Sequence, residues 1–565
     1  LYVNDDRNYS YLGVRGFLRP GDSNERVLVL VDGHAMNDAP FESSLIGREF
    51  GVDIEAVERI EVIRGPVSSL YGTNAVFGVV NIVTRSAPAP RHEDALGAGA
   101  TFEADTRRAG KAGIVLDRFL GEDVYVLGSA SGFYALGQSQ EYPELEREGF
   151  PARTAPELDR EQAENAFLKL AWGPLTLEGG INRRRKLIPT ASYGATPHEE
   201  ESALDGRQFA EARLELPLRD RLDVTARVYY DGSTFLSRLP FPPELGGRER
   251  LLARGETGGA EAVATARPVD GVRATVGADL RRNFDITFRL ASEEGARKDE
   301  QTEFDSYAVF ADAEVDLIPH ITLTGGARYD RFETFGERAS PRAALLVNPL
   351  AGTVLKLIYG EAFRAPSVYE LYFTEAVGAP IVKHDLDPET VRHWEAEAEQ
   401  ELLDGRLRLA LSYFRYDVKG LISAVPDGAG SIRYGNAEDV RGSGAEVGLD
   451  GRLPWRGVRG GLSYTFAEVV DDDSRERLSS SPQHLALARL MLPVHDDRVF
   501  VGVTGRFIGE RPGLDGRPHA PAAGTVDLTV TWDDILPRLD LAAGVTDVAD
   551  ARWDAPGSFE HRQDL

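Results

Sequence analysis

Histidines and clustered carboxylates are the side chains of this sequence with the most obvious capacity for chemistry. There are ten histidines, but none falls in a His-Glu-x-x-His pattern, whose two histidines would share one helix face and bind zinc. The runs His198-Glu199-Glu200-Glu201 and Asp471-Asp472-Asp473 carry oxygen ligands for a cation, although a solvated charge run is the more ordinary interpretation. No spacing joins serine, histidine and aspartate into a nucleophile with its base. We therefore predict a protein that is not an enzyme, with no catalytic residue, no metal site and no cofactor.

Net charge and cysteine content exclude several classes of protein. The formal net charge of -27 at pH 7 would repel the phosphates of a nucleic acid. The 565 residues include no cysteine, so no disulfide framework supports the fold. The charge suits long solvated loops at a cell surface, although an acidic soluble protein would have the same total.

The apolar segments are all of strand length. None approaches the roughly 18 consecutive apolar residues that a membrane-spanning helix needs. A chain of this kind that spans a membrane must therefore form a closed β-barrel, since nothing else satisfies its backbone in lipid. The first residues, Leu1-Tyr2-Val3-Asn4, show no signal peptide and begin in mid-pattern, so we interpret the chain as mature and truncated at this end.

Residues 1–86 are rich in turns and predict a small α+β domain. The predicted elements are a buried strand (27–31), a short helix or turn (54–58), a strand (59–63) and a further apolar strand (76–83). The first of these strands ends at the turn Asp32-Gly33. Residues 87–94, which begin with alternating alanine and proline, predict a linker to the rest of the chain.

Residues 95–565 alternate apolar with polar or small residues in segments of about ten, which is typical of barrel strands with a lipid face and a lumen face. Residues 406–416 are one example: Leu407, Leu409, Leu411 and Tyr413 share one face, and Arg408, Ala410, Ser412 and Phe414 share the other. Short turns alternate with long polar connections, as in an outer-membrane barrel. The long connections cover residues 135–163, 184–206, 236–254, 285–303, 364–391, 470–481 and 509–521. A propeller would also alternate, but it would repeat a blade motif, and we find none.

The strand count predicts the size of the barrel. We count about 21 candidate strands, of which the last is 539–545. Single-chain bacterial barrels have an even number, so we expect one more strand beyond Leu565. A barrel of about 22 strands encloses a lumen wide enough to need a plug. The fold class that we predict is an all-β membrane barrel of about 22 antiparallel strands, with the small N-terminal α+β domain in its lumen.

Five motifs in a fixed order carry a resemblance to a known family. They are Val14-Arg15-Gly16-Phe17, Val27-Leu28-Val29-Leu30-Val31-Asp32-Gly33, Ile54-Glu55-Ala56-Val57-Glu58-Arg59-Ile60-Glu61-Val62-Ile63-Arg64-Gly65-Pro66, Ser69-Leu70-Tyr71-Gly72 and Gly78-Val79-Val80-Asn81-Ile82-Val83-Thr84. This series resembles the plug of TonB-dependent outer-membrane receptors. The barrel half matches more loosely, through Phe363-Arg364-Ala365-Pro366-Ser367, Glu370-Leu371-Tyr372, Leu386-Asp387-Pro388-Glu389-Thr390, Trp394-Glu395, Asn436 and Gly444-Ala445-Glu446. The TonB box, the first part of the plug and the terminal strand of the family are absent, which we interpret as truncation of the chain at both ends.

The resemblance implies residues that dock the plug. Plug arginines of the family pair with glutamates of the barrel wall, and by motif these are Arg15 and Arg64 with Glu395 and Glu446. A guanidinium fork joins two carboxylates with directional, charge-assisted bonds, which suits a confined lumen. The alternative is that each is an ordinary solvated charge of the lumen.

The resemblance also implies a function. We expect a receptor of the Gram-negative outer membrane that takes up a scarce ligand, a ferric siderophore above all, driven by a TonB-type inner-membrane complex and surrounded by membrane lipid and lipopolysaccharide. The ligand would bind among the long loops and the tip of the plug, and the candidate contacts are His34, Phe41, Tyr369, Tyr372 and His384. Haem receptors of the family carry an axial histidine near a Phe-Arg-Ala-Pro box, which makes His384 their candidate here, but the usual Asn-Pro-Asn-Leu box is replaced by residues 384–388. Haem, cobalamin and oligosaccharide therefore stay open, as do a passive porin and a surface adhesin.

Overall fold

The computed structural model of the chain describes most of its residues. The described residues are 2–19, 23–86, 97–106, 108–121, 123–147, 149–243, 247–293, 295–372, 385–426, 432–453, 457–495, 498–513, 518–537 and 539–551. The linker expected at 87–94 lies outside them.

The N-terminal residues form a four-stranded sheet and a separate hairpin. The sheet has the order β4-β3-β6-β5, in which β3 and β6 are parallel and the other two pairs are antiparallel. The elements are β1 (Tyr2–Asp5), β2 (Ser10–Gly13), β3 (Val27–Val31), β4 (His34–Ala35), η1 (Ile54–Ala56), β5 (Val57–Arg64), α1 (Ser68–Tyr71) and β6 (Gly78–Thr84). All five residues of β3 are buried, because both faces are covered: Val27 and Val29 belong to a hydrophobic cluster with the wall, and Leu28 and Leu30 belong to a separate hydrophobic cluster. The strand predicted at 27–31 and the helix followed by a strand predicted at 54–63 are confirmed.

The rest of the described chain forms one closed barrel of 21 strands, in which consecutive strands are antiparallel neighbours. The strands are β7 (Gly97–Asp105), β8 (Ala109–Leu120), β9 (Val124–Ala135), β10 (Glu161–Trp172), β11 (Leu175–Leu187), β12 (Ser202–Arg219), β13 (Leu222–Pro240), β14 (Arg248–Ala266), β15 (Val272–Ser292), β16 (Gly295–Ile318), β17 (Ile321–Phe332), β18 (Gly336–Val347), β19 (Thr353–Arg364), β20 (Glu389–Leu402), β21 (Leu407–Pro426), β22 (Ile432–Arg452), β23 (Arg459–Asp471), β24 (His484–His495), β25 (Val499–Ile508), β26 (Ala523–Leu536) and β27 (Leu539–Val545). The predicted fold class and the count of strands within the chain are confirmed. A further strand beyond Leu565 stays a prediction.

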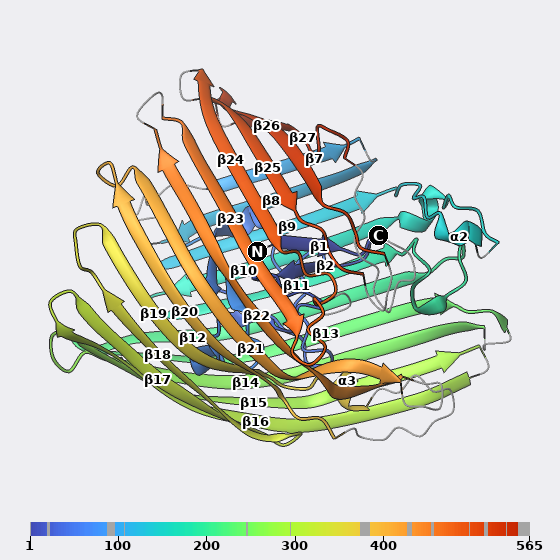
Figure 1. The fold of residues 1–565 in the computed structure, drawn as a ribbon. Helices are drawn as coiled ribbons and strands as arrows, with labels where there is room; N and C mark the ends of the chain where they lie inside the picture. Colours follow the sequence, from blue (N-terminus) through green and yellow to red (C-terminus); the bar gives the residue numbers. More distant parts are fainter. Residues whose placement is uncertain are drawn as a thin grey trace.

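The N-terminal sheet lies inside the ring of barrel strands (Figure 1). Its buried side chains pack into shared hydrophobic clusters with the wall: Val14, Phe17 and Val29 contact the cluster that contains Phe414 and Tyr416. We call residues 2–86 the plug, since they fill the lumen at these contacts. None of the helices in the described part of the chain has the length and apolarity that a membrane-crossing helix needs.

The longer connections all lie at one end of the barrel. They contain the short helices α2 (Glu144–Arg147), η2 (Pro156–Asp159), η3 (Ser192–Gly194) and α3 (Val368–Tyr372). Two of the predicted long loops, 236–254 and 285–303, are wrong, because β13 to β16 continue through them to short turns. Their polar side chains pair across the extended ladder, as Arg289 Nη2 and Asp299 Oδ2 do at 2.7 Å. The charged residues of these two segments therefore belong to strands that extend into water, and not to loops.

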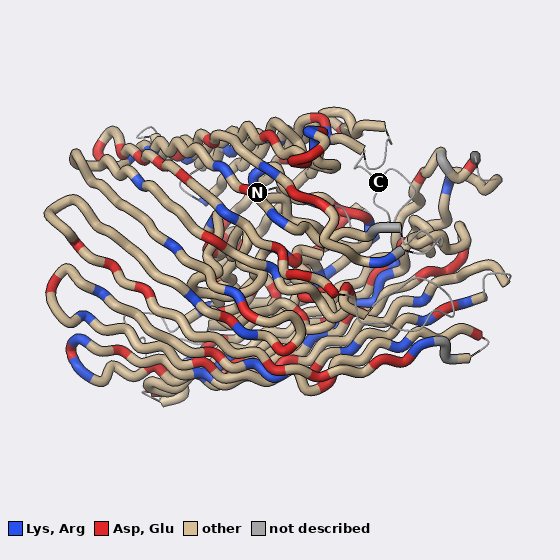
Figure 2. Tube along the Cα trace, turned by 60° about the horizontal axis from the view of Figure 1, so that its bottom comes forward, with Lys and Arg blue, Asp and Glu red and all other residues tan. Residues whose placement is uncertain are grey.

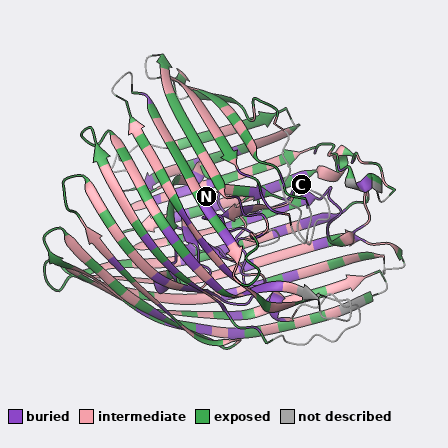
Figure 3. Cartoon of the chain, viewed as in Figure 1, coloured by how far each residue is buried: buried purple, intermediate pink, exposed green. Residues whose placement is uncertain are grey.

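The two faces of the strands differ in burial as their sequence alternation predicts (Figure 3). In β21, Leu411 and Tyr413 on the outer face are 44% and 56% exposed, whereas Phe414 on the lumen face is fully buried. Charged residues of both signs are interspersed along the chain (Figure 2). The outer face of β21 therefore matches the apolar band of a membrane barrel, and its lumen face contacts the plug.

We expect an arginine on the outer face of β21 to destabilise the barrel far more than one on the lumen face. Leu411→Arg should lower the free energy of unfolding in phosphatidylcholine vesicles by about 2–4 kcal/mol, because the guanidinium enters the hydrocarbon layer. The matched control is Ala410→Arg on the lumen face, which should cost clearly less. Urea unfolding in vesicles measures both, and an equal or larger loss for Ala410→Arg would contradict the assignment of the faces.

Candidate functional site

Arg15 lies on a tight turn of the plug and points at the barrel wall. The turn is closed by two backbone hydrogen bonds between Val14 and Phe17, and Arg15 has a left-handed φ of 51°. Gly16 follows with a φ of 80°, and a Cβ at this position would lie 2.8 Å from the Cβ of Ala467 on β23. Glycine is therefore required here for the turn to approach the wall.

The Arg15 guanidinium contacts two wall glutamates. Its Nη1 donates to Glu395 Oε2 at 3.1 Å, its Nη2 pairs with Glu395 Oε1, and Nη2 lies 3.3 Å from Glu446 Oε2. Arg64 Nη1 reaches the same Glu446 oxygen at 3.0 Å. The structure thus brings together all four residues that the family resemblance predicted for docking.

His393 of β20 joins this group and was not identified from the sequence as a contact. Its Nε2 lies 2.8 Å from Arg15 Nη1, and its side chain is 3% exposed. Because a guanidinium only donates, Nε2 must accept, so this ring nitrogen carries no proton. The ring of Phe414 lies 4.7 Å from the Arg15 guanidinium carbon. We call Arg15, Arg64, His393, Glu395 and Glu446 the Arg15 cluster.

A second contact between plug and wall centres on His34, which follows the turn Asp32-Gly33. Its Nδ1 lies 3.0 Å from Glu211 and its Nε2 lies 3.1 Å from Asp231. Two carboxylates can both accept only if the imidazole carries both protons, so His34 is an imidazolium here. Burial acts to lower the pKa of His34, but Asp231 and Glu211 outweigh it and raise the pKa to about 9. His34 is 1% exposed, so its placement does not fit the expected contact with a ligand at the mouth.

Phe41 at the tip of the plug lies in a group of rings near the end of the barrel that carries the long connections. Its ring centroid is 5.6 Å from both Phe235 and Phe288, and 5.1 Å from Tyr369 on α3. Tyr369 also contacts Tyr434 of β22 at 5.9 Å. We call these five residues the aromatic cluster. Plug, wall and external connection each contribute to it.

An apolar cavity of about 30 Å³ adjoins the aromatic cluster. It is lined by Leu251, Phe288, Leu290, Lys298, Glu300, Val368, Tyr369 and Tyr372. Of the five expected ligand contacts, Tyr369 and Tyr372 line this cavity, and Phe41 contacts the ring of Tyr369. His384 lies outside the described residues.

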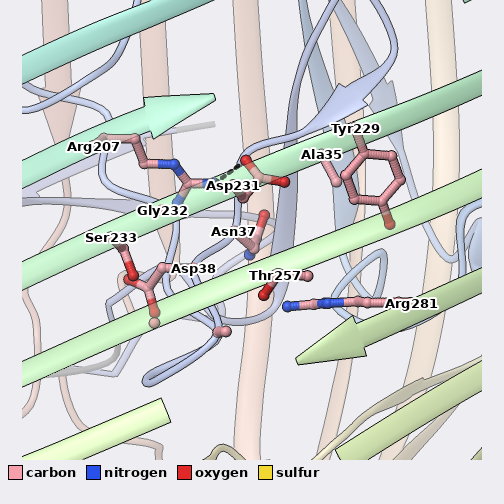
Figure 4. Close-up of a pocket in the computed structure, with 12 residues that line it drawn as sticks. Ala35, Asn37, Asp38, Arg207, Tyr229, Asp231, Gly232, Ser233, Thr257 and Arg281 are labelled. Atoms are coloured by element: carbon pink, nitrogen blue, oxygen red, sulfur yellow. Dashed lines mark hydrogen bonds and ion pairs between the residues drawn. The ribbon is translucent and has the colours of Figure 1, made fainter. Parts of the chain in front are cut away.

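A polar cavity of similar size lies deeper, between the plug and strands β12 to β15 (Figure 4). Arg207 and Asp231 on its wall form an ion pair at 3.3 Å, and Arg281 and Asp38 also line it. A volume of about 30 Å³ with this lining suits one or two water molecules. Among the described residues, no group of three His, Asp or Glu side chains is arranged to bind a metal ion.

Two regions of the chain match known families of sequence. Residues 159–548 match the family described as TonB dependent receptor-like, beta-barrel, and residues 3–79 match the TonB-dependent Receptor Plug Domain. The chain belongs to the TonB-dependent receptors. The family and its structural neighbours are transport receptors and not enzymes.

The curated relatives of this receptor are distant. The chain is 25% identical over 407 residues to a ferric enterobactin receptor of Pseudomonas aeruginosa, which covers 61% of this chain and 52% of the relative. It is 28% identical over 201 residues to the metal-pseudopaline receptor CntO of the same species, over 32% of this chain and 28% of the relative. The chain thus spans about half of the first relative and less of the second.

Solved structures share the fold of this receptor. The copper transporter OprC has a TM-score of 0.80 at 17% identity, covering 100% of this chain and 90% of that one. A crystal structure of the ferric enterobactin receptor PfeA of Pseudomonas aeruginosa has a TM-score of 0.74 at 19% identity, covering 96% and 89%. At these identities the likeness shows the fold alone.

His34 makes the stability of the receptor depend on pH. The folded pKa of about 9 exceeds the ordinary 6.5, so the stabilisation is fully present below pH 6.5 and is lost as pH rises through 9. We expect a loss on the order of 3 kcal/mol across this interval. His34→Gln should flatten the profile of unfolding free energy between pH 6.5 and 9, measured in detergent by urea titration.

The control for this prediction is His198→Asn in an external connection, where the ring contacts the carbonyl of Pro151 and no plug residue. This variant should keep the profile of the unmodified receptor. A profile that is unchanged by His34→Gln would contradict the charged state inferred for His34.

Proposed function

We propose that this receptor lies in the outer membrane of a Gram-negative bacterium and takes up a ferric siderophore by energy-coupled transport. The observation that carries the proposal is the aromatic cluster, in which the plug tip, the wall and α3 meet beside an apolar cavity. Small-ligand sites usually combine an apolar and aromatic lining with a few polar groups. A ligand that touched Tyr369 and Phe41 would contact an external connection and the plug at once.

The relatives support the choice of ligand class. One is a receptor for ferric enterobactin, and a structural neighbour is named a ferric-catecholate import receptor. Siderophores with aromatic iron-binding groups would present flat rings to the aromatic cluster, where offset or edge-on ring contacts add stabilisation. Haem, cobalamin and oligosaccharides are the alternative ligands, of which the experiment below includes the first two.

The plug supports the proposal that transport is active. Buried ion pairs and shared hydrophobic clusters join plug and wall, so a ligand passes only if the plug rearranges. The family supplies the energy for this step through a TonB-type inner-membrane complex, which we propose as the partner of this receptor. Membrane lipid and lipopolysaccharide would surround the outer face.

Truncation of the aromatic cluster should weaken ligand binding. We expect Phe41→Ala and Tyr369→Ala each to raise the Kd for ferric enterobactin by about tenfold, since each ring loses stacking and apolar contact. The measurement is equilibrium binding of a panel of ferric enterobactin, a ferric hydroxamate siderophore, haem and cobalamin. Tyr413→Ala on the lipid face is the control and should leave every Kd unchanged.

Two outcomes would contradict this assignment. Binding of haem or cobalamin, with no binding of either siderophore, would refute the proposal that the ligand is a ferric siderophore. Unchanged affinity of Phe41→Ala for whichever ligand binds would refute the aromatic cluster as its site.

We further propose that the Arg15 cluster docks the plug. Glu395→Gln should lower the free energy of plug opening by about 3–5 kcal/mol, because it leaves the Arg15 charge buried without its bidentate partner. Amide hydrogen exchange of β3 in detergent reports this free energy. The control is Glu61→Gln, which breaks the exposed pair with Arg59 and should cost less than about 1 kcal/mol. Equal exchange in the two variants would mean that the Arg15 cluster does not dock the plug.

A further inference from the structure

Arg364 is a fully buried charge at the start of the connection 365–388. It ends β19, and its side chain has no exposed surface. Its Nη1 lies 2.6 Å from Glu25 Oε2 of the plug and 2.8 Å from Glu370 Oε2 of α3. Its Nη2 lies 2.8 Å from both Glu370 Oε1 and Glu389 Oε1 of β20. One guanidinium thus contacts the plug, the external connection and the wall.

The contact between Arg364 and the external connection involves Glu370 of α3, the short helix that also carries Tyr369 of the aromatic cluster. Glu370 bonds Arg364 with both oxygens and also accepts from the backbone N–H of Ser367 at 2.8 Å. Its neighbour Tyr369 contacts the Phe41 ring and donates its backbone N–H to the carbonyl of Pro40 at 3.0 Å. A displacement of this five-residue helix therefore moves both a ring of the candidate ligand site and the carboxylate that contacts Arg364.

Arg364 is linked to the plug in two ways. Besides the direct contact with Glu25, Arg364 shares Glu389 with Arg26 of the plug, whose Nε lies 2.8 Å from Glu389 Oε2. The side chains of Arg26 and Glu389 are 5% and 1% exposed. The backbone N–H of Ala365, next to Arg364, donates to Thr73 Oγ1 of the plug at 3.0 Å. We call Glu25, Arg26, Arg364, Glu370 and Glu389 the Arg364 cluster.

We propose that Arg364 is a positioning residue that joins helix α3 to the plug, so that displacement of α3 loosens the plug segment at Glu25 and Arg26. This inference rests on the proposed function in one respect, namely that α3 contacts a ligand. Its test needs no ligand. The reason lies in the fork geometry: a planar guanidinium with fixed donors serves three carboxylates only while all three keep their positions. Since the group is buried, a carboxylate that moves away leaves charge unpaired, and the remaining contacts weaken together.

The Arg15 cluster lacks this property. Its members come from the plug and from strands β20 and β22, and the contacts described for them include no residue of the connection 365–388. The Arg15 cluster joins the plug to the wall, whereas the Arg364 cluster joins the plug to both the wall and the external connection. The two clusters therefore predict different responses to a change in α3.

Amide hydrogen exchange of the ligand-free receptor in lipid nanodiscs tests the inference. Glu370→Gln removes the α3 arm and should raise exchange at least about tenfold both in residues 365–372 and in plug residues 23–31. Glu25→Gln removes the plug arm at a partly exposed carboxylate and should raise exchange in the same two segments. Asp159→Asn, which breaks a pair between an external connection and Lys186 without touching the plug, is the matched control and should change neither segment.

Faster exchange in 365–372 with unchanged exchange in 23–31 for Glu370→Gln would overturn the proposal, because Glu370 would then only anchor its own helix. Unfolding of the barrel would raise exchange in β10 and β11 as well. In that event Ser367→Ala replaces Glu370→Gln, because it removes only one hydroxyl contact with Glu370. This variant must then raise exchange in both 365–372 and 23–31, by a smaller factor. A receptor that binds no siderophore but shows the paired response would refute the proposed function and leave this inference intact.

Discussion

A charged side chain that leaves water must meet an opposite charge, and this requirement governs the boundary between plug and barrel wall. This boundary is formed by two surfaces of the same chain, and both surfaces carry charge. Three buried cations of the plug lie opposite complementary groups of the wall: Arg15 meets Glu395 and Glu446, Arg26 meets Glu389, and His34 meets Glu211 and Asp231. Such pairs add little net stability compared with apolar packing, but each fixes one position of the plug, since a misplaced plug would leave charges unpaired.

These contacts differ in what they connect. The Arg15 cluster and His34 join the plug to different parts of the wall, β20 to β22 and β12 to β13, and so determine how the plug is oriented in the lumen. The Arg364 cluster adds the external connection through α3. In the proposed function, the receptor would retain its plug through contacts that a ligand does not reach, while the Arg364 cluster would change with the external connection.

Much of the fold follows from the sequence, because few structures other than a barrel maintain an alternation of period two over so long a stretch. The last strand was predicted to the residue at 539–545, and the buried strand at 27–31 likewise. The strand ends within 236–254 and 285–303 were missed because their many charged residues are typical of loops by composition, whereas in the structure such residues pair across the ladder, as Arg289 and Asp299 do. The long ladders that pair β13 with β14 and β15 with β16 were not visible from composition.

The candidate site was predictable only in part. The meeting of Arg15 with Glu395 and Glu446 came from the family resemblance, since residues 380 positions apart leave no local pattern. His393 and the link from Arg364 to Glu370 were missed, although this arginine and glutamate lie only six residues apart. His34 was expected at the mouth because it follows an exposed-looking turn, yet the wall carboxylates that enclose it come from distant strands.

The central claim is that the plug closes the barrel and that ligand passes only when energy displaces it. The most direct test is the accumulation of iron-55, carried by the siderophore that binds most tightly, in cells whose outer membrane offers no other route for it. Our account predicts saturable accumulation that stops when a proton uncoupler removes the energy of the inner membrane. Accumulation that continues in the presence of the uncoupler and rises in proportion to concentration would contradict it, because the barrel would then be an open pore.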